Sequence, residues 1–158
     1  MNYLKLSGFC LLCTLLCAIA SAQDKVPLNE PDNNKPKLFT HLPDQIPVTI
    51  NELKSFISAN TETGKQVQLN SSDNKIPGFN GKIVSHASKY QDRINSVVVR
   101  LDRFDGATLT LSSSTQADGT VLYTGRIISF KNSDLYELQK KDDQYILIKK
   151  NYYELVNE

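Results

Sequence analysis

The chain has few side chains of the kinds that carry out catalysis or hold a metal. It contains two histidines, His41 and His86, and all three of its cysteines lie within the first 17 residues. A zinc site normally takes three or four His, Cys or carboxylate ligands, and no His-x-x-x-His spacing is present. A Gly-x-Ser-x-Gly elbow and a glycine-rich phosphate loop are also missing from the sequence. We therefore expect no metal and no cofactor.

One catalytic arrangement stays open, because a Ser-His-Asp group depends on positions in space rather than in sequence. A small hydrolase would use His86 and a nearby carboxylate. Two carboxylate pairs exist, Asp102 with Asp105 and Asp142 with Asp143, but both fall in predicted turns beside basic residues. General acid–base catalysis by two carboxylates requires a cleft that holds one of them in an apolar environment. Solvated turn acids are the favoured interpretation, and a hydrolase is the least favoured of three functions.

A seven-residue pattern occurs twice, as FNGKIVS at residues 79–85 and as YTGRIIS at residues 123–129. In an extended strand the aromatic residue, the glycine, the isoleucine and the serine of each copy share one face, and Lys82 and Arg126 lie on the other. One interpretation makes these two cations paired anchors for an anionic ligand. The favoured interpretation is structural, since a glycine inside a strand usually marks a bend or a close backbone approach.

Tyrosines gather near the C-terminus and are interleaved there with lysines. Tyrosine offers rigid, amphipathic contact area and is enriched at binding surfaces. It is also a good strand residue, and half of the tyrosines should face inward under strict alternation. Both interpretations stay open. If a binding surface exists here, its predicted residues are Arg126, Tyr136, Lys140, Tyr145 and Lys149.

The first 22 residues have the composition of a signal peptide. Lys5 precedes an apolar run over residues 8–20, and the stretch ends in Ala-Ser-Ala, a small-x-small cleavage site. An apolar run this short, followed at once by polar chain, is not expected to span a bilayer. We expect cleavage near Ala22-Gln23, export to the periplasm or the extracellular space, and no transmembrane segment afterwards. The cysteines leave with this segment, so the processed chain has no disulfide.

The charges argue against several classes of partner. The chain carries 18 basic and 17 acidic side chains, and removal of Lys5 leaves 17 of each sign, interspersed along the sequence. Binding to nucleic acid or to an acidic membrane calls for a basic excess or a basic stripe. We therefore expect a monomer whose partner is an extracytoplasmic protein or a small ligand, and not a nucleic acid.

Proline and asparagine dominate the segment that follows the predicted cleavage site. Residues 23–37 hold too few apolar side chains to offset the entropy of ordering, so we predict a disordered linker there. Residues 38–48 are richer in apolar side chains and contain two prolines. Because proline excludes a helix, this stretch is predicted to lie extended against the domain.

A helix is predicted over residues 50–59. Thr49 and Glu52 have the spacing of a capping box at its start. Apolar residues then recur at helical spacing from Ile50 to Ile57. A helix of this length is marginal alone, so it needs a sheet to pack on.

After residue 64 the apolar pattern changes from helical to alternating. Short connections rich in Asp, Asn and Gly separate the alternating stretches, so the sheet should be antiparallel. The candidate strands are residues 65–70, 79–86, 96–102, 107–112, 120–130, 135–140 and 144–150. The predicted fold is mainly β (α+β), with one short helix packed on a bent antiparallel sheet or small open β-barrel of about six to seven strands. Residues 38–158 should form a single domain, and the repeated pattern suggests two related three-stranded units.

These features favour a secreted, non-catalytic binding or inhibitory module. The alternative is a carrier that encloses a small apolar ligand inside a curved sheet. A carrier needs an internal apolar cavity of about 300–1,000 Å³. A binding module needs a filled core and an exposed contact surface, whereas a hydrolase needs a histidine within hydrogen-bonding distance of a serine or a carboxylate.

Overall fold

The computed structural model describes residues 34–59 and 62–152, which belong to one compact unit. Within them, eight antiparallel strands form a single sheet accompanied by one helix. The elements in chain order are β1 (Gln45–Val48), α2 (Ile50–Ala59), β2 (Gln66–Leu69), β3 (Phe79–Lys89), β4 (Ile94–Leu101), β5 (Thr108–Thr115), β6 (Val121–Ile128), β7 (Asp134–Lys141) and β8 (Gln144–Asn151). The predicted signal peptide and residues 23–33 of the predicted linker lie outside the described residues.

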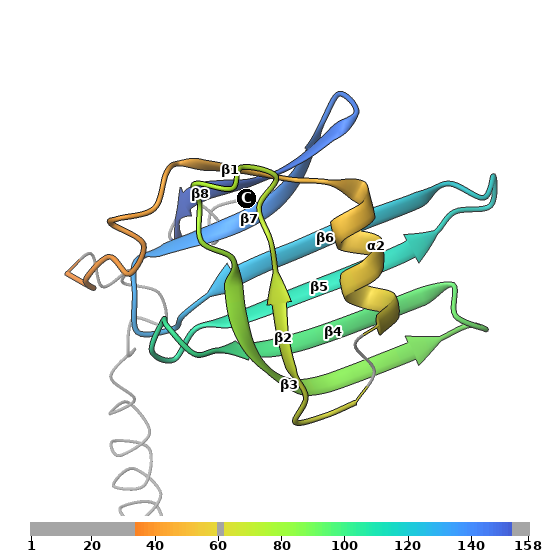
Figure 1. The fold of residues 1–158 in the computed structure, drawn as a ribbon, viewed down its shortest axis with the longest axis horizontal. Helices are drawn as coiled ribbons and strands as arrows, with labels where there is room; N and C mark the ends of the chain where they lie inside the picture. The colour runs from red at the N-terminus through yellow and green to blue at the C-terminus, as the bar shows by residue number, and fades with distance from the viewer. Residues whose placement is uncertain (1–33, 60–61, 153–158) are drawn as a thin grey trace, which may run out of the picture. The chain divides into compact units, whose positions relative to one another are not determined.

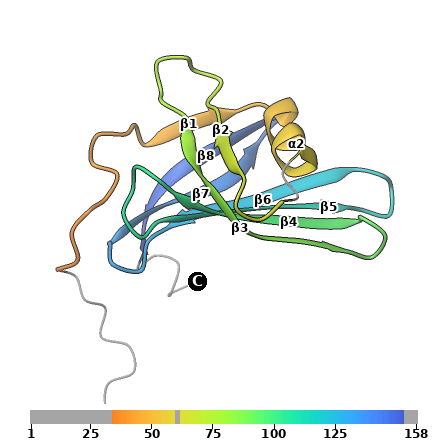
Figure 2. The ribbon, with the colours of Figure 1, turned by 60° about the horizontal axis from the view of Figure 1, so that its bottom comes forward.

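The sheet is an up-and-down meander that curls into a half-barrel (Figure 1, Figure 2). Strands β2 to β8 pair in sequence order, and β1 pairs antiparallel with β8. The helix α2 connects the two edge strands and lies over the inner face, where it contacts β2, β4 and β5. The N–H of Ser72, after β2, donates to Pro47 O of β1 at 2.8 Å, which ties the two edges together at one end. The predicted mainly β fold, with one helix on a bent antiparallel sheet, is confirmed.

The eighth strand is a small difference from the prediction of six to seven strands. Strand β1 belongs to the segment predicted only to lie extended against the domain, and its four residues pair with residues 145–148 of β8. Pro47 has no N–H to donate, but proline is tolerated on an edge strand. A four-residue stretch that contains a proline is too short for its alternation to identify a strand.

The inner face of the half-barrel is filled by side chains where α2 and the residues before β1 cover it. Phe39, which precedes β1, is fully buried, and its ring centroid lies 5.1 Å from those of Tyr136 and Phe104. Leu53 and Phe56 of α2 are buried in the same cluster. Because burial of one large apolar side chain contributes about 1.5–3 kcal/mol, this layer holds the helix on the sheet.

The start of α2 differs in one respect from the predicted capping box. The N–H of Glu52 donates to Thr49 Oγ1 at 3.1 Å, as expected. The Glu52 carboxylate instead accepts from the backbone N–H and the side-chain amide of Asn70, both at 3.0 Å. Ile50 is 45 % exposed, so the buried stripe of the helix begins at Leu53. Glu52 therefore ties the helix to the end of β2.

Residues 34–44, which we call the strap, contact the starting end of β7 and the finishing end of β8. The Asp134 carboxylate accepts from the backbone N–H groups of Leu38 and of the next residue, at 2.6 and 2.9 Å. Pro36 O accepts from the N–H of Ser133 at 3.1 Å. Pro36 belongs to residues 23–37, the segment predicted to be a disordered linker. Composition did not reveal the contact because the acceptor is a backbone carbonyl, which every residue has.

The repeated seven-residue pattern begins β3 in its first copy, and its second copy occupies the end of β6 and runs one residue past it. A Cβ atom added at Gly81 would lie 2.2 Å from Arg100 O, and one at Gly125 would lie 2.8 Å from Thr110 O. Neither distance is compatible with a side chain, because a carbonyl oxygen of the next strand occupies the space. These distances support the structural interpretation of the repeat, in which each glycine permits a close approach between strands.

Candidate binding surface

Two of the predicted contact residues, Tyr136 and Tyr145, are buried, with 0 % and 2 % of their surface exposed. The Tyr136 hydroxyl donates to Pro43 O of the strap at 2.5 Å. Burial raises the pKa of this phenol, and the nearby carboxylates of Asp44 and Asp134 raise it further, so the hydroxyl remains a donor. Both rings belong to the core, and a partner cannot reach them. The predicted exposed surface therefore cannot include these two residues.

Lys149 also makes its contacts within the protein. Its Nζ donates to Leu42 O at 2.5 Å and forms an ion pair with Asp44 Oδ1 at 3.2 Å, so it holds the strap. Lys140 is exposed near the end of β7, on the strand face that points inward. Arg126 is exposed on the opposite face of the sheet. The five predicted residues therefore do not form one surface.

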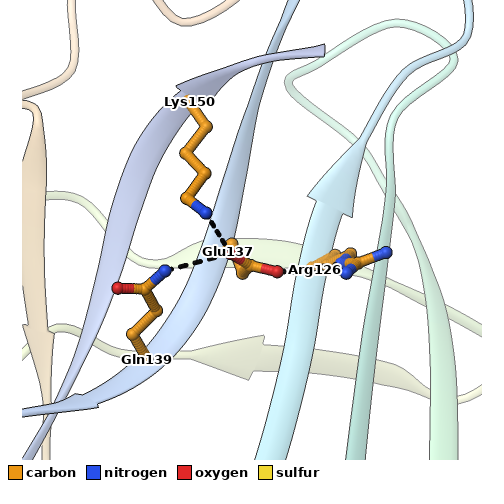
Figure 3. Close-up of polar contacts among 4 residues, drawn as sticks. All are labelled: Arg126, Glu137, Gln139 and Lys150. Atoms are coloured by element: carbon orange, nitrogen blue, oxygen red, sulfur yellow. Dashed lines mark hydrogen bonds and ion pairs between the residues drawn. The ribbon is translucent and has the colours of Figure 1, made fainter. Parts of the chain in front are cut away.

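Arg126 is the predicted residue that lies in a defined polar cluster, on the outer face away from α2. Its Nε and Nη2 donate to Glu137 Oε1 at 3.3 and 3.0 Å. Lys150 Nζ contacts Glu137 Oε2 at 2.7 Å, and Gln139 Nε2 donates to the same oxygen at 3.0 Å. Figure 3 shows the Glu137 carboxylate between its three partners, which come from β6, β7 and β8. Adjacent strands in register place these side chains together, since Arg126 is directly opposite Glu137.

The cluster fixes its carboxylate in the charged form. Burial alone would raise the pKa of Glu137, but hydrogen bonds from Lys150, Gln139 and Arg126 outweigh burial and hold the pKa below its usual range. Two cations therefore surround one carboxylate. The side chains of Glu137 and Lys150 are 16 % and 19 % exposed, whereas that of Arg126 is 53 % exposed. The cation of this cluster that is most exposed to solvent is thus the guanidinium of Arg126.

Arg126 borders an open depression of about 490 Å³ on the outer face. Beside Arg126 and Glu137, its lining includes three hydroxyl side chains from β5 and β6 and two apolar residues from β6 and β7. The full lining is Thr110, Ser112, Thr124, Gly125, Arg126, Ile128, Glu137 and Leu138. A guanidinium beside hydroxyl groups is suited to contacting a carboxylate or another planar anion.

The depression lies where β6 and β7 separate. These strands are paired only from Gly125 to Ile127, which face Leu138 to Tyr136, whereas the neighbouring strand pairs extend over seven or eight residues. Before Gly125 in the chain, β6 is no longer paired with β7. Leu138, the partner of Gly125, lines the depression. The two halves of the sheet therefore diverge at this point, and the divergence creates the hollow on the outer face.

Glu137, Gln139 and Lys150 were missed as members of this cluster by sequence reasoning. The alternation of β7 and β8 already placed them on the face of their strands opposite Tyr136 and Tyr145. The missing information was the register, because only the pairing of Arg126 with Glu137 shows that the two charges meet. The equivalent residue of the repeat, Lys82, faces Arg100 of β4 instead, so the two copies have different electrostatic surroundings.

The described residues do not assemble a catalytic group around either histidine. His41 is exposed and His86 is half-buried, and within the described part of the chain neither forms a hydrogen bond or ion pair with a serine or a carboxylate. The predicted turn acids lie in turns: Asp105 makes an exposed ion pair with Lys131 at 3.4 Å, and Asp142 adopts a left-handed φ of 53°.

Across residues 34–59 and 62–152, no three His, Cys, Asp or Glu side chains lie close enough together to hold a metal ion. No helix in that part of the chain combines the length and the apolar character needed to cross a bilayer.

Comparison with known protein families, with curated proteins and with solved structures finds no match for this chain. The described residues therefore define a structural class, a curled eight-stranded antiparallel half-barrel with the helix α2 on its inner face. The function proposed below rests on the geometry of the described residues.

Proposed function

We propose that this protein is a secreted, non-catalytic binding module, and that its partner contacts the outer-face depression around Arg126. The observation that carries the proposal is the ordered, half-exposed guanidinium of Arg126, which lies beside the Glu137 carboxylate, a group that already has its hydrogen-bond donors. Glu137 is satisfied by Arg126, Lys150 and Gln139, and the Arg126 side chain is still 53 % exposed, so its guanidinium can accept an anionic group.

The geometry favours a protein partner that presents an Asp or Glu side chain. Arg126 is held in one orientation by two of its nitrogens, which leaves Nη1 available to a partner. A side chain that is ordered before binding loses little conformational entropy on association. The adjacent Ile128 and Leu138 supply apolar contact area, which is typical of the centre of a protein interface.

The filled interior supports a binding module over a carrier. On the inner face, the centroid of the buried Tyr136 ring lies 5.1 Å from that of Phe39 and 6.1 Å from that of Phe79. The space that a carrier would need for an enclosed apolar ligand is occupied there by the protein's own side chains. The hydrolase alternative has no support from the surroundings of His41 and His86 in the described residues.

The test uses immobilised protein to capture partners from the extracytoplasmic fraction of the source cells. Arg126→Gln should reduce capture of the specific partner about tenfold, which is the size expected when a charge-assisted hydrogen bond is lost. Lys82→Gln is the matched control, because Lys82 is an exposed cation at the equivalent position of the repeat. Equal capture by the wild-type protein and Arg126→Gln would refute the assignment of this surface.

The extracytoplasmic location has its own test. We expect the protein isolated from the source cells to begin at Gln23, since cleavage after Ala-Ser-Ala removes the predicted signal peptide. Intact-mass measurement of the exported protein distinguishes this start from an uncleaved chain. Recovery of the uncleaved chain from the cytoplasmic fraction would contradict export.

A further inference from the structure

The inner face carries a second hollow, at the end of the sheet that α2 leaves uncovered. The hairpins β3–β4 and β5–β6 extend past the helix in Figure 1. Between them and the helix lies an open recess of about 410 Å³, which we call the inner recess. Its lining is Lys54, Ile57, Ser58, His86, Asp92, Asn95, Ser113, Thr115, Val121 and Tyr123. A volume of this size is within the range of small-molecule sites.

The strands position the floor of the inner recess. Asn95, Ser113 and Tyr123 are directly opposite one another on β4, β5 and β6, so their side chains form one row across the inner face. The Tyr123 ring is fixed by an edge contact with Tyr145, at a centroid distance of 5.5 Å and an interplanar angle of 89°. Rigid elements therefore place an aromatic surface beside an amide and a hydroxyl.

Hydrogen-bond donors predominate among the groups that a ligand could use. Within the described residues, the side chains of Lys54, His86 and Ser113 have no hydrogen-bond or ion-pair partner. The carboxylate in the lining, Asp92, already accepts from Ser88 Oγ at 2.5 Å. The inner recess therefore offers an ammonium group, an imidazole and a hydroxyl, and one oxygen of its own carboxylate already accepts a hydrogen bond.

The loop that supplies Asp92 has a strained backbone. Tyr90, Gln91 and Asp92 have φ values of 54°, 55° and 63°, three consecutive non-glycine residues in the left-handed region. The side-chain amide of Asn95 donates to Asp92 O at 2.7 Å and helps to hold this conformation. Strained backbone persists only where surrounding contacts impose it, and it is concentrated at functional sites. The strain here lies at the edge of the inner recess.

We infer that the inner recess binds a small organic carboxylate with a short apolar body. The carboxylate meets Lys54 and His86, which supply donors from α2 and β3. The apolar body lies against Val121, which is 40 % exposed, and against the small exposed parts of Ile57 and of the Tyr123 ring. A neutral ligand of the same shape would leave the ammonium group without a charged partner, so the charge is required. This inference is independent of the proposed function, because Arg126 lies on the other face of the sheet.

The test measures binding of defined probes to the purified full-length protein by titration calorimetry, with chemical shifts of the His86 ring as a second readout. The probes are hexanoate and phenylacetate, with hexanamide and phenylacetamide as neutral counterparts of matched shape. We expect saturable binding of at least one carboxylate, and about tenfold weaker binding of its amide. The His86 resonances should shift with the same saturation curve.

Two variants locate the site by different means. Lys54→Met removes the cation and should weaken carboxylate binding about tenfold. Val121→Trp fills the hollow without a change of charge and should abolish binding of both carboxylates. Both positions are exposed, so the variants should remain folded, which thermal unfolding can verify. Lys140→Met is the control and should bind as the wild type does.

Three results would overturn the inference. The first is the absence of saturable binding of either carboxylate up to about 10 mM, beyond which affinity is too weak to indicate a built site. The second is equal binding of the amide and the carboxylate. The third is unchanged binding in a folded Lys54→Met or Val121→Trp protein.

Discussion

The hydroxyl of Tyr145 accepts a hydrogen bond from the backbone N–H of Tyr123 at 3.1 Å, at the point where β6 and β7 stop pairing. A side-chain oxygen from β8 thus takes the place of a carbonyl that β7 would supply in a continuous ladder. Both rings are buried and pack edge to face. This contact satisfies a backbone donor that would otherwise be left unpaired in the core, and it lies behind the outer-face depression.

Replacement of Tyr145 by Phe tests this role. The ring remains but the acceptor is lost, so the buried N–H of Tyr123 has no partner. We expect the free energy of unfolding to fall by about 1–3 kcal/mol, measured by urea denaturation. The control is Tyr90→Phe, because Tyr90 is 73 % exposed and its hydroxyl can be replaced with a change within about 0.5 kcal/mol. Equal stabilities of the two variants would contradict the role assigned to the Tyr145 hydroxyl.

The polar cluster on the outer face predicts a specific dependence of stability on pH. The folded-state pKa of Glu137 is lowered below its ordinary value of 4.5, so the unfolded chain binds the proton more tightly. The cluster's contribution is therefore present above pH 4.5 and is lost as the pH falls through the lowered folded-state pKa. Glu137→Gln should reduce stability near neutral pH and make the acid limb of the stability curve shallower.

Urea denaturation of the wild type and Glu137→Gln, at about pH 7 and about pH 3, measures this difference. The stability gap between the two proteins should be larger at the higher pH. Asp105→Asn is the control, since the Asp105 side chain is 92 % exposed and its ion pair with Lys131 contributes little. A gap that is the same at both pH values would show that the charge of Glu137 is not the source of the stability.

Asp134 anchors the strap, so its replacement should also lower the stability of the protein. Asp134 is 4 % exposed and accepts two backbone hydrogen bonds, from Leu38 and Phe39. Asp134→Ala leaves both donors without an acceptor and should lower the free energy of unfolding by about 2–4 kcal/mol. Asp134→Asn keeps one acceptor oxygen and should cost less.

Limited proteolysis separates local release of the strap from global destabilisation. In the Asp134→Ala protein, cleavage within residues 34–44 should precede cleavage in the sheet, because the strap has lost its anchor while the strands remain paired. Simultaneous loss of the strap and the sheet would contradict a local role for Asp134.

The two glycines of the repeated pattern predict a ranked pair of effects. A Cβ atom at Gly81 would lie 2.2 Å from a backbone oxygen and one at Gly125 would lie 2.8 Å from another. Neither backbone oxygen can move without disturbing a strand pair. Gly81→Ala should therefore destabilise the protein more than Gly125→Ala, with costs of about 1–3 kcal/mol or more. Urea denaturation measures the ranking, and a neutral Gly81→Ala would show that β3 and β4 adjust freely.

Local patterns in the sequence were sufficient to predict the main elements of the fold. Alternation of apolar residues predicted seven of the eight strands, because a strand with one buried face shows a period of two over five or more residues. Helical spacing and Thr49 predicted α2, and the glycines at positions 81 and 125 predicted close approaches between strands. These signals are local, since each depends on neighbours within one element.

Contacts between distant segments could not be predicted in the same way. Strand β1 and the strap attach to β7 and β8 about one hundred residues further along the chain, partly through backbone carbonyls that carry no sequence signal. The tyrosines at 136 and 145 are typical both of strands and of binding surfaces, and only the curl of the sheet and the position of the strap place them in the core.

The sequence by itself determined the antiparallel, mainly β architecture, the helix α2, and the absence of any thiol beyond Cys17. The tertiary structure decided which charges meet, because the register of β6 against β7 places Arg126 opposite Glu137. It also decided where the hollows lie, at the divergence of β6 from β7 and beyond the end of α2. The physical reason is that periodicity specifies which face of a strand is buried, whereas register and curvature result from packing of the whole sheet.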